Sequence, residues 1–67
     1  MTIKSLLKKC ETGFDLIVVA DSTSGHTVEY SNVKDAQIEA GSIKIISWEV
    51  GYYVDGRTIK ILLFITI

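Results

Sequence analysis

The stretch that most constrains the fold is the last third of the chain, residues 42–67, with the sequence SIKIISWEVGYYVDGRTIKILLFITI. Two runs rich in β-branched and aromatic residues flank Asp55-Gly56, which is the pattern of a β-hairpin with a two-residue turn. The second run includes residues 61–65, ILLFI, which are apolar at every position. A strand that is apolar on both sides has neighbours on both faces. We therefore expect the fold to be built on this hairpin.

A type I′ turn at Asp55-Gly56 would fix the register of the hairpin by pairing Val54 with Arg57. One face is then wholly apolar and is the expected core face, with the pairs Tyr52–Ile59, Val50–Ile61, Trp48–Leu63 and Ile46–Ile65. The reverse face is mixed, with the pairs Tyr53–Thr58, Gly51–Lys60, Glu49–Leu62, Ser47–Phe64 and Ile45–Thr66. A shift by one residue would place Glu49 and Lys60 in the core, so the alternation favours this register.

The N-terminal segment has the spacing of an amphipathic helix over residues 3–10. The apolar positions of this helix are Ile3, Leu6, Leu7 and Cys10. Thr2 is placed to cap the first turn, and Gly13 is expected to end the helix in the left-handed conformation. About ten residues are too few for a stable isolated helix, so the segment must dock on the sheet.

The middle of the chain predicts a second hairpin. Residues 14–20, FDLIVVA, are strongly β-prone, residues 21–25 are turn formers, and residues 26–30 alternate in polarity. Residues 31–41 fit either a short helix or an irregular crossover, and the sequence leaves both open.

Together these elements predict a single α+β domain over residues 1–67, with one short N-terminal helix packed on a four-stranded antiparallel sheet of two hairpins. The helix covers one face, and the apolar residues of the other face need a second cover. Residues 31–41, a second copy of the chain and a partner protein are the alternatives. The candidate partner or dimer surface consists of Ile45, Leu62, Phe64 and Tyr53.

Composition narrows the function classes. Seven basic against eight acidic residues give a net charge of −1, which argues against nucleic-acid binding. No apolar run reaches the roughly 20 residues of a membrane span, and the lysine-containing N-terminus does not have the pattern of a signal peptide. A single cysteine excludes a disulfide within the chain. We expect a cytoplasmic protein that does not act at a membrane.

The residues that could carry chemistry are few. His26 is the only histidine, and Asp21 is its one obvious carboxylate neighbour, across a predicted turn. Cys10 lies on the apolar side of the predicted helix, where a cysteine behaves as a small hydrophobic residue. One Cys and one His do not make a spaced ligand set for a metal. The sequence therefore predicts no catalytic, cofactor-binding or metal-binding residue, and no enzyme.

Three short segments follow one another along the chain: IKSLLKKC, FDLIVVAD and IISWEV. Their order resembles that of a group of small proteins from Gram-positive bacteria and their phages, which combine an N-terminal LLxxC helix, a hairpin, a connecting segment and an SWxV strand. The resemblance implies no catalytic residue. It implies an accessory protein of a mobile element, of the kind that inhibits or modulates a host defence protein.

The functional hypothesis is a non-enzymatic protein that binds another protein, or a second copy of itself, through the second sheet face or an edge strand. One alternative is a small nucleic-acid-binding domain that uses Lys44, Arg57, Lys60 and the tyrosines. The other is a structural accessory protein that forms homo-oligomers.

Overall fold

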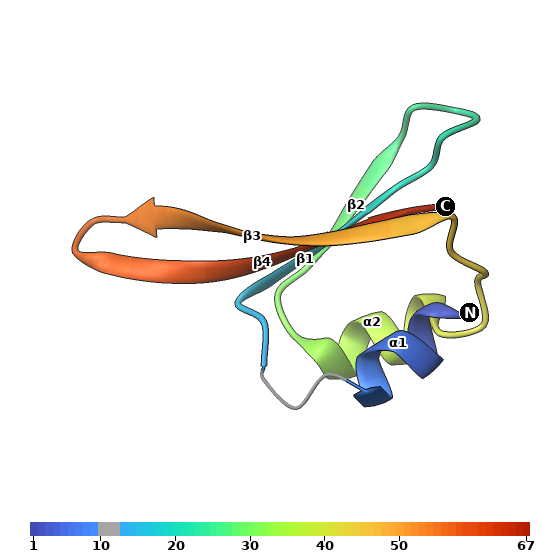
Figure 1. Ribbon diagram of the computed structural model, residues 1–67, viewed down its shortest axis with the longest axis horizontal. Helices are drawn as coiled ribbons and strands as arrows, with labels where there is room; N and C mark the ends of the chain where they lie inside the picture. Colours follow the sequence, from blue (N-terminus) through green and yellow to red (C-terminus); the bar gives the residue numbers. More distant parts are fainter. Residues whose placement is uncertain (10–12) are drawn as a thin grey trace.

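The computed structural model describes residues 1–9 and 13–67 of the chain. The elements in order are α1 (Ile3–Lys9), β1 (Leu16–Ala20), β2 (Thr27–Tyr30), α2 (Val33–Ala40), β3 (Ser47–Asp55) and β4 (Thr58–Thr66). The strands form one sheet in the order β2-β1-β4-β3, and both helices lie on the same side of it (Figure 1). The predicted α+β class is confirmed.

The sheet is mixed, so the prediction of a purely antiparallel sheet is wrong. β1 pairs antiparallel with β2, and β3 pairs antiparallel with β4, but the two central strands β1 and β4 run parallel. The segment containing α2 carries the chain from one edge of the sheet to the other, and β4 then returns beside β1. The alternation of residues shows which face a side chain takes, but it does not show which strand lies beside it.

Helix α1 begins as the sequence predicts. The Ser5 N–H donates to Thr2 Oγ1 at 3.2 Å, and the Thr2 N–H donates to Ser5 Oγ at 3.0 Å, so both residues cap the first turn. Cys10 lies outside the described residues. The predicted end of the helix at Gly13 depends on residues 10–12, which also lie outside the described residues, so it stays a prediction.

Residues 31–41 contain a true helix, which settles the alternatives that the sequence left open. Asn32 caps α2 by accepting a hydrogen bond from the Asp35 N–H at 2.8 Å. The buried residues of α2 are Ala36 and Ala40, which join the core beneath α1. Since α2 lies beside α1, it does not cover the reverse face of the sheet, as one of the alternatives required (Figure 1).

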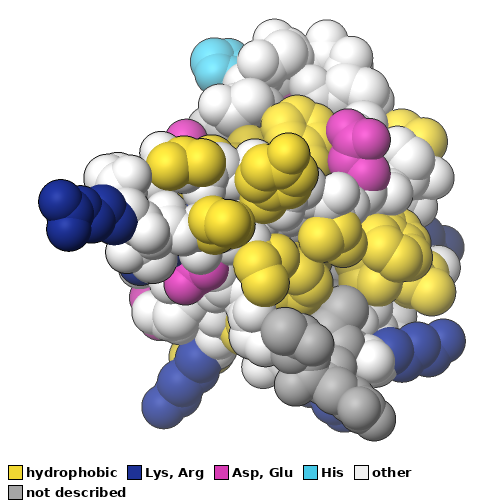
Figure 2. All heavy atoms as spheres, turned by 60° about the vertical axis from the view of Figure 1, so that its left-hand side comes forward, with side chains coloured by type: hydrophobic (Ala, Val, Ile, Leu, Met, Phe, Trp, Pro, Cys, Tyr) yellow, Lys and Arg dark blue, Asp and Glu magenta, His cyan; other side chains and the backbone are white. Residues whose placement is uncertain are grey.

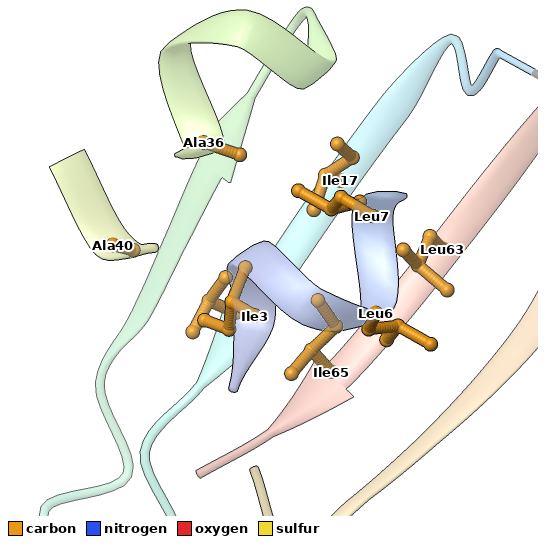
Figure 3. Close-up of a cluster of buried hydrophobic side chains, with 9 residues drawn as sticks. Ile3, Leu6, Leu7, Ile17, Ala36, Ala40, Leu63 and Ile65 are labelled. Carbon is orange, nitrogen blue, oxygen red and sulfur yellow. The ribbon is translucent and has the colours of Figure 1, made fainter. Parts of the chain in front are cut away.

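The core lies between the helices and the two central strands (Figure 3). Side chains of α1 point toward Ile17 of β1 and toward Leu63 and Ile65 of β4. Those three strand residues are fully buried. The complete cluster consists of Ile3, Leu6, Leu7, Ile17, Val19, Ala36, Ala40, Leu63 and Ile65.

The segment before β3 is held by the N-terminus. The Ile3 N–H donates to the Ile43 carbonyl at 2.9 Å, and the Ile45 N–H donates to the Met1 carbonyl at 2.9 Å. Thr2 and Lys44 form an isolated antiparallel bridge between these contacts. The bridge keeps residues 43–45 out of the sheet, and Ile45 packs against the helix-side core.

The helices are too short to cover the whole hairpin. α1 has 7 residues and α2 has 8, which at about 1.5 Å per residue gives lengths of about 10–12 Å. β3 and β4 have 9 residues each, which at about 3.3 Å per residue gives about 30 Å. The end of the β3–β4 hairpin therefore projects beyond the helical layer (Figure 1).

Within the described part of the chain, neither helix is both long and apolar enough to cross a membrane.

Candidate interaction surface

The β3–β4 hairpin turns at Gly56-Arg57, not at Asp55-Gly56. Asp55 pairs with Thr58, and Val54 pairs with Ile59 instead of Arg57. Gly56 has a φ of 63° and is the only residue of the turn with a positive φ, which matches a type II′ turn with glycine at its first central position. The predicted register is therefore wrong by two positions along one strand. Because the shift is an even number of residues, every side chain keeps its predicted face.

The helix-side face of the projecting hairpin carries an exposed row of apolar side chains, which we call the apolar strip. Its members and their exposed fractions are Trp48 (48%), Val50 (54%), Tyr52 (75%), Val54 (66%) and Ile59 (67%). In Figure 2, which brings the hairpin side of the molecule forward, apolar side chains gather on the visible surface. An exposed apolar group of this kind marks a contact site on many soluble proteins.

The sequence predicts Trp48, Val50, Tyr52 and Ile59 as part of the core face, but the fully buried residues of that face are Leu63 and Ile65 of β4. Leu63 and Ile65 are fully buried, whereas their cross-strand neighbours Val50 and Trp48 are about half-exposed. The signal that could have identified the strip was the length of the elements, because a helix of two turns cannot cover two nine-residue strands.

The backbone of β3 also has an outward side. In β4, Ile61 directs both backbone groups toward β1, since its carbonyl accepts from the Asp15 N–H at 2.9 Å and its N–H donates to Asp15 Oδ2 at 2.8 Å. The Ile67 N–H likewise donates to the Ala20 carbonyl. Because backbone direction alternates along a strand, the even-numbered residues of β4 bond β3, and their partners are the odd-numbered residues of β3.

It follows that the even-numbered residues of β3 direct their N–H and C=O groups away from β4: Trp48, Val50, Tyr52 and Val54. No strand pairs with this outer edge in residues 1–9 and 13–67. The four strip residues that belong to β3 are thus the same ones that present unpaired strand backbone.

The reverse side of the sheet, which we call the open face, carries a second apolar group. Leu16 pairs with Leu62, and Val18 pairs with Phe64, across the parallel strands. Val18 is only 8% exposed. Neither helix reaches this face (Figure 1).

The structure brings together three of the four residues of the candidate surface. Leu62, Phe64 and Tyr53 share the open face, where Leu62 and Phe64 are half-buried and Tyr53 is 38% exposed. Ile45 does not join them, because the bridge to the N-terminus turns it toward the core. A shallow hollow of about 220 Å³ lies at the base of the hairpin, lined by Ser47, Trp48, Glu49, Phe64 and Thr66.

His26 and Asp21 lie in the loop between β1 and β2. The Asp21 side chain binds backbone N–H groups of that loop. Its Oδ1 accepts hydrogen bonds from the Thr23 N–H at 2.8 Å and the Ser24 N–H at 3.4 Å. These backbone bonds, with Thr23 the stronger, lower the pKa of the Asp21 carboxyl below its usual value. His26 is exposed. The carboxylate nearest to the histidine therefore stabilises the loop.

Tyr30, at the end of β2, is the other titratable group with a shifted pKa. Burial raises the pKa of its phenol, and the neighbouring Glu39 on α2 adds to the increase. Tyr30 packs against the core, so its ring is part of the contact between β2 and the helical layer.

The basic residues of the nucleic-acid alternative do not form one patch. Arg57 lies in the turn of the hairpin, and Lys44 lies beyond the opposite end of β3. Lys60 takes the open face beside Tyr53. Among the residues that the structure describes, no three His, Cys, Asp or Glu side chains gather into a metal-binding group.

No family model, no curated protein and no solved structure matches this chain.

Proposed function

We propose that the protein is a non-enzymatic interaction module that binds a protein through the projecting β3–β4 hairpin. The observation that carries the proposal is the coincidence, in β3, of exposed apolar side chains and outward-directed backbone groups. In the narrower form implied by the resemblance to phage-type proteins, the module belongs to a mobile element and modulates a host protein.

The apolar strip supports this proposal on energetic grounds. Leaving a Val, Ile or aromatic side chain in water forgoes roughly 1.5–3 kcal/mol each compared with full burial. A domain of this size has only about 5–15 kcal/mol of total stability. Five such residues on one strip are therefore costly to leave exposed, and a bound protein would recover part of that free energy.

The outer edge of β3 supports a particular mode of binding. An edge strand that directs N–H and C=O groups outward can accept a strand from a partner, so that backbone hydrogen bonds provide affinity and alternate side chains provide specificity. β3 has 9 residues, all paired continuously with β4, so its backbone is held in the extended conformation that such a partner needs.

The distribution of charge favours a protein partner over a nucleic acid. The tip has Asp55 and Arg57 close together in the turn, and Glu49 lies between them and the base. Nucleic-acid binding requires a basic groove beside the aromatic residues. Here the acidic Glu49 and Asp55 share the hairpin with the basic Arg57 and Lys60.

The proposal is tested by affinity capture from the native host, followed by direct titration of the captured protein with the purified chain. The variant is Val50→Thr/Tyr52→Thr, which keeps β-prone residues but removes apolar surface from the strip. The matched control is Val28→Thr, which changes an apolar residue of similar exposure (49%) on β2, the other edge strand.

The expected result is a protein that binds the wild type and the Val28 control but binds the strip variant at least tenfold more weakly. A captured protein that binds all three equally would show that the hairpin is not the contact surface. Binding of a nucleic acid at low salt, without any protein partner, would overturn the proposal in favour of the nucleic-acid alternative.

A further inference from the structure

We infer that the partner fitted to the outer edge of β3 is a second copy of the chain, paired antiparallel about a two-fold axis at Gly51. The two copies would join their sheets edge to edge into one continuous sheet. This inference rests on the proposed function, because it names the partner of the same hairpin.

The backbone of β3 is suited to this pairing. The outward-directed residues Val50 and Tyr52 flank Gly51 symmetrically, and so do Trp48 and Val54. In an antiparallel pair centred on Gly51, Val50 lies opposite Tyr52 of the second copy, and Trp48 lies opposite its Val54. Each of these pairs can exchange two N–H···O bonds, as residues of a hydrogen-bonded antiparallel pair do.

The side chains are self-complementary in the same register. Directly opposed residues share a face of the sheet, so the strips of the two copies would meet on one side. One row of neighbours then runs Ile61–Tyr52–Val50–Leu63, crossing from one copy into the other between Tyr52 and Val50. The second row runs Ile59–Val54–Trp48–Ile65. Both rows are apolar throughout, and each ends on a fully buried core residue.

The opposite face has no directly opposed like charges in this register. Ser47 faces Asp55, Glu49 faces Tyr53, and Gly51 faces itself. A register centred on Tyr52 would instead place Glu49 opposite Asp55 twice, and like charges directly opposed destabilise a sheet. A register centred on Val50 would leave Val54 and Asp55 without a partner inside β3. Only the register at Gly51 pairs all 9 residues without placing like charges directly opposite each other.

Gly51 itself points to a close neighbour outside the chain. Its φ is not positive, and a Cβ added there would meet nothing within 4 Å. A glycine inside a strand weakens the strand, and it often marks a place where another backbone approaches closely. At the two-fold axis the two Gly51 residues would form a non-hydrogen-bonded pair, with Cα atoms about 4.5 Å apart, the nearer of the two antiparallel pair types.

The edge also lacks most of the features that usually prevent such pairing, and its only charged residues, Glu49 and Asp55, lie on the face opposite the apolar strip. Natural edge strands are protected by lysine, proline, a bulge or short length. β3 contains no Lys, Arg or Pro, and its register with β4 is unbroken over 9 residues. The other edge strand, β2, has only 4 residues, so it offers less backbone to a second copy.

The exposed area is compatible with a modest interface. An aromatic side chain has roughly 150–250 Å² to bury, so Trp48 at 48% exposure and Tyr52 at 75% expose on the order of 100–150 Å² each. A standard interface uses about 800 Å² per partner. The two aromatic residues supply at most a third of that area, because side chains paired across a sheet keep their outer surface in solvent, and the aliphatic strip residues and the edge backbone add to it. We therefore expect a concentration-dependent dimer.

The first test is the mass of the wild-type chain by multi-angle light scattering over a range of concentrations up to the millimolar. The expected mass rises from 7.4 kDa toward twice that value. The strip variant Val50→Thr/Tyr52→Thr should stay monomeric at concentrations where the Val28→Thr control is dimeric. A wild-type chain that stays monomeric throughout would overturn the inference.

The second test determines the register of the β3–β3 pair by disulfide cross-linking of introduced cysteines. Each variant also carries Cys10→Ser, so that the introduced cysteine is the only thiol. Gly51→Cys should form a disulfide-linked dimer under mild oxidation, because a non-hydrogen-bonded pair brings its Cα atoms within disulfide range. A mixture of Glu49→Cys and Tyr53→Cys chains should cross-link to each other faster than either chain cross-links to itself. Val28→Cys is the matched control on the other edge.

The outcomes separate this inference from the proposed function. A monomer that still binds a different protein through the strip would overturn the second copy and leave the interaction module in place. A dimer in which Gly51→Cys cross-links no faster than Val28→Cys would overturn the β3 register. A dimer that survives the strip variant would overturn the pairing of two copies at this edge, and it would leave the proposed function to be decided by the binding of a captured protein.

Discussion

The base and the tip of the β3–β4 hairpin carry similar apolar side chains, but those at the base are buried and those at the tip are exposed to solvent. At the base, Leu63 and Ile65 are fully buried beneath the helices. At the tip, Ile59 and Val54 lie on the same side of the same strands and are about two-thirds exposed. The difference comes from the reach of the helices. Burial in this protein is therefore set by the length of the covering layer, and the surplus apolar surface at the tip is available to another chain.

The sharpest way to test that contrast is to truncate one apolar side chain at each end. Leu63→Ala at the base should lower the free energy of unfolding by about 2–5 kcal/mol, because it leaves a cavity in the core. Ile59→Ala at the tip should cost at most about 1 kcal/mol, the value of a cross-strand pair. Urea denaturation of both variants, followed by circular dichroism, provides the measurement. Equal losses would show that the tip is covered as well as the base.

A second prediction concerns the cover itself, where α2 meets α1. A Cβ at Gly41 would collide with the Gln37 carbonyl and lie 3.2 Å from Lys4 Cβ, and the Gly41 carbonyl accepts a hydrogen bond from the Lys4 N–H at 3.0 Å. Gly41→Ala should therefore destabilise the domain by about 1–3 kcal/mol, as overpacking does. Gly13→Ala is the matched control, since a Cβ there meets nothing within 4 Å. Thermal unfolding of the two variants should differ clearly.

A third prediction concerns the tip alone. Gly56 has a φ of 63°, and an L-residue held there costs roughly 1–2 kcal/mol. Gly56→Ala should loosen the turn while the base stays intact. Amide hydrogen exchange should accelerate at Tyr53 and Lys60 but remain slow at Ile17 and Leu63. Uniform acceleration along the hairpin would mean that base and tip open as one unit.

The smallest expected effect depends on pH and lies in the other hairpin. The pKa of Asp21 is lowered in the folded protein by the N–H groups of Thr23 and Ser24, so its carboxylate contributes stability above the usual pKa of about 3.9. That contribution is lost as the pH falls through the lowered value. NMR titration should place the Asp21 midpoint below that of an exposed aspartate. Asp21→Asn should remove this part of the acid sensitivity and leave the β3–β4 tip unchanged.

The sequence predicts correctly those features of the structure that depend on residues close together in the chain. The Thr2 cap, the buried face of α1, the β1–β2 pairing and the facing of every β3 and β4 side chain follow from local spacing. The exact pairing in the β3–β4 hairpin did not, because Asp-Gly fits either a type I′ turn or the first half of a type II′ turn. The parallel contact of β1 with β4 was missed because apolar alternation carries no information on strand direction.

For the candidate surface, the sequence identified Leu62, Phe64 and Tyr53 as residues of one face, and they do share it. It misplaced Ile45, because the bridge between Thr2 and Lys44 joins residues far apart in the chain. It also assigned the apolar strip to the core, since hydrophobicity shows that a side chain favours burial and does not show what will bury it.

The sequence by itself determined the class of the fold, the faces of the strands and the amount of apolar surface that needs cover, because these follow from composition and periodicity. Only the tertiary structure decided where the cover ends. That depends on where two short helices dock, and docking is set by contacts between distant segments. The closing hairpin is thus core at its base and surface at its tip.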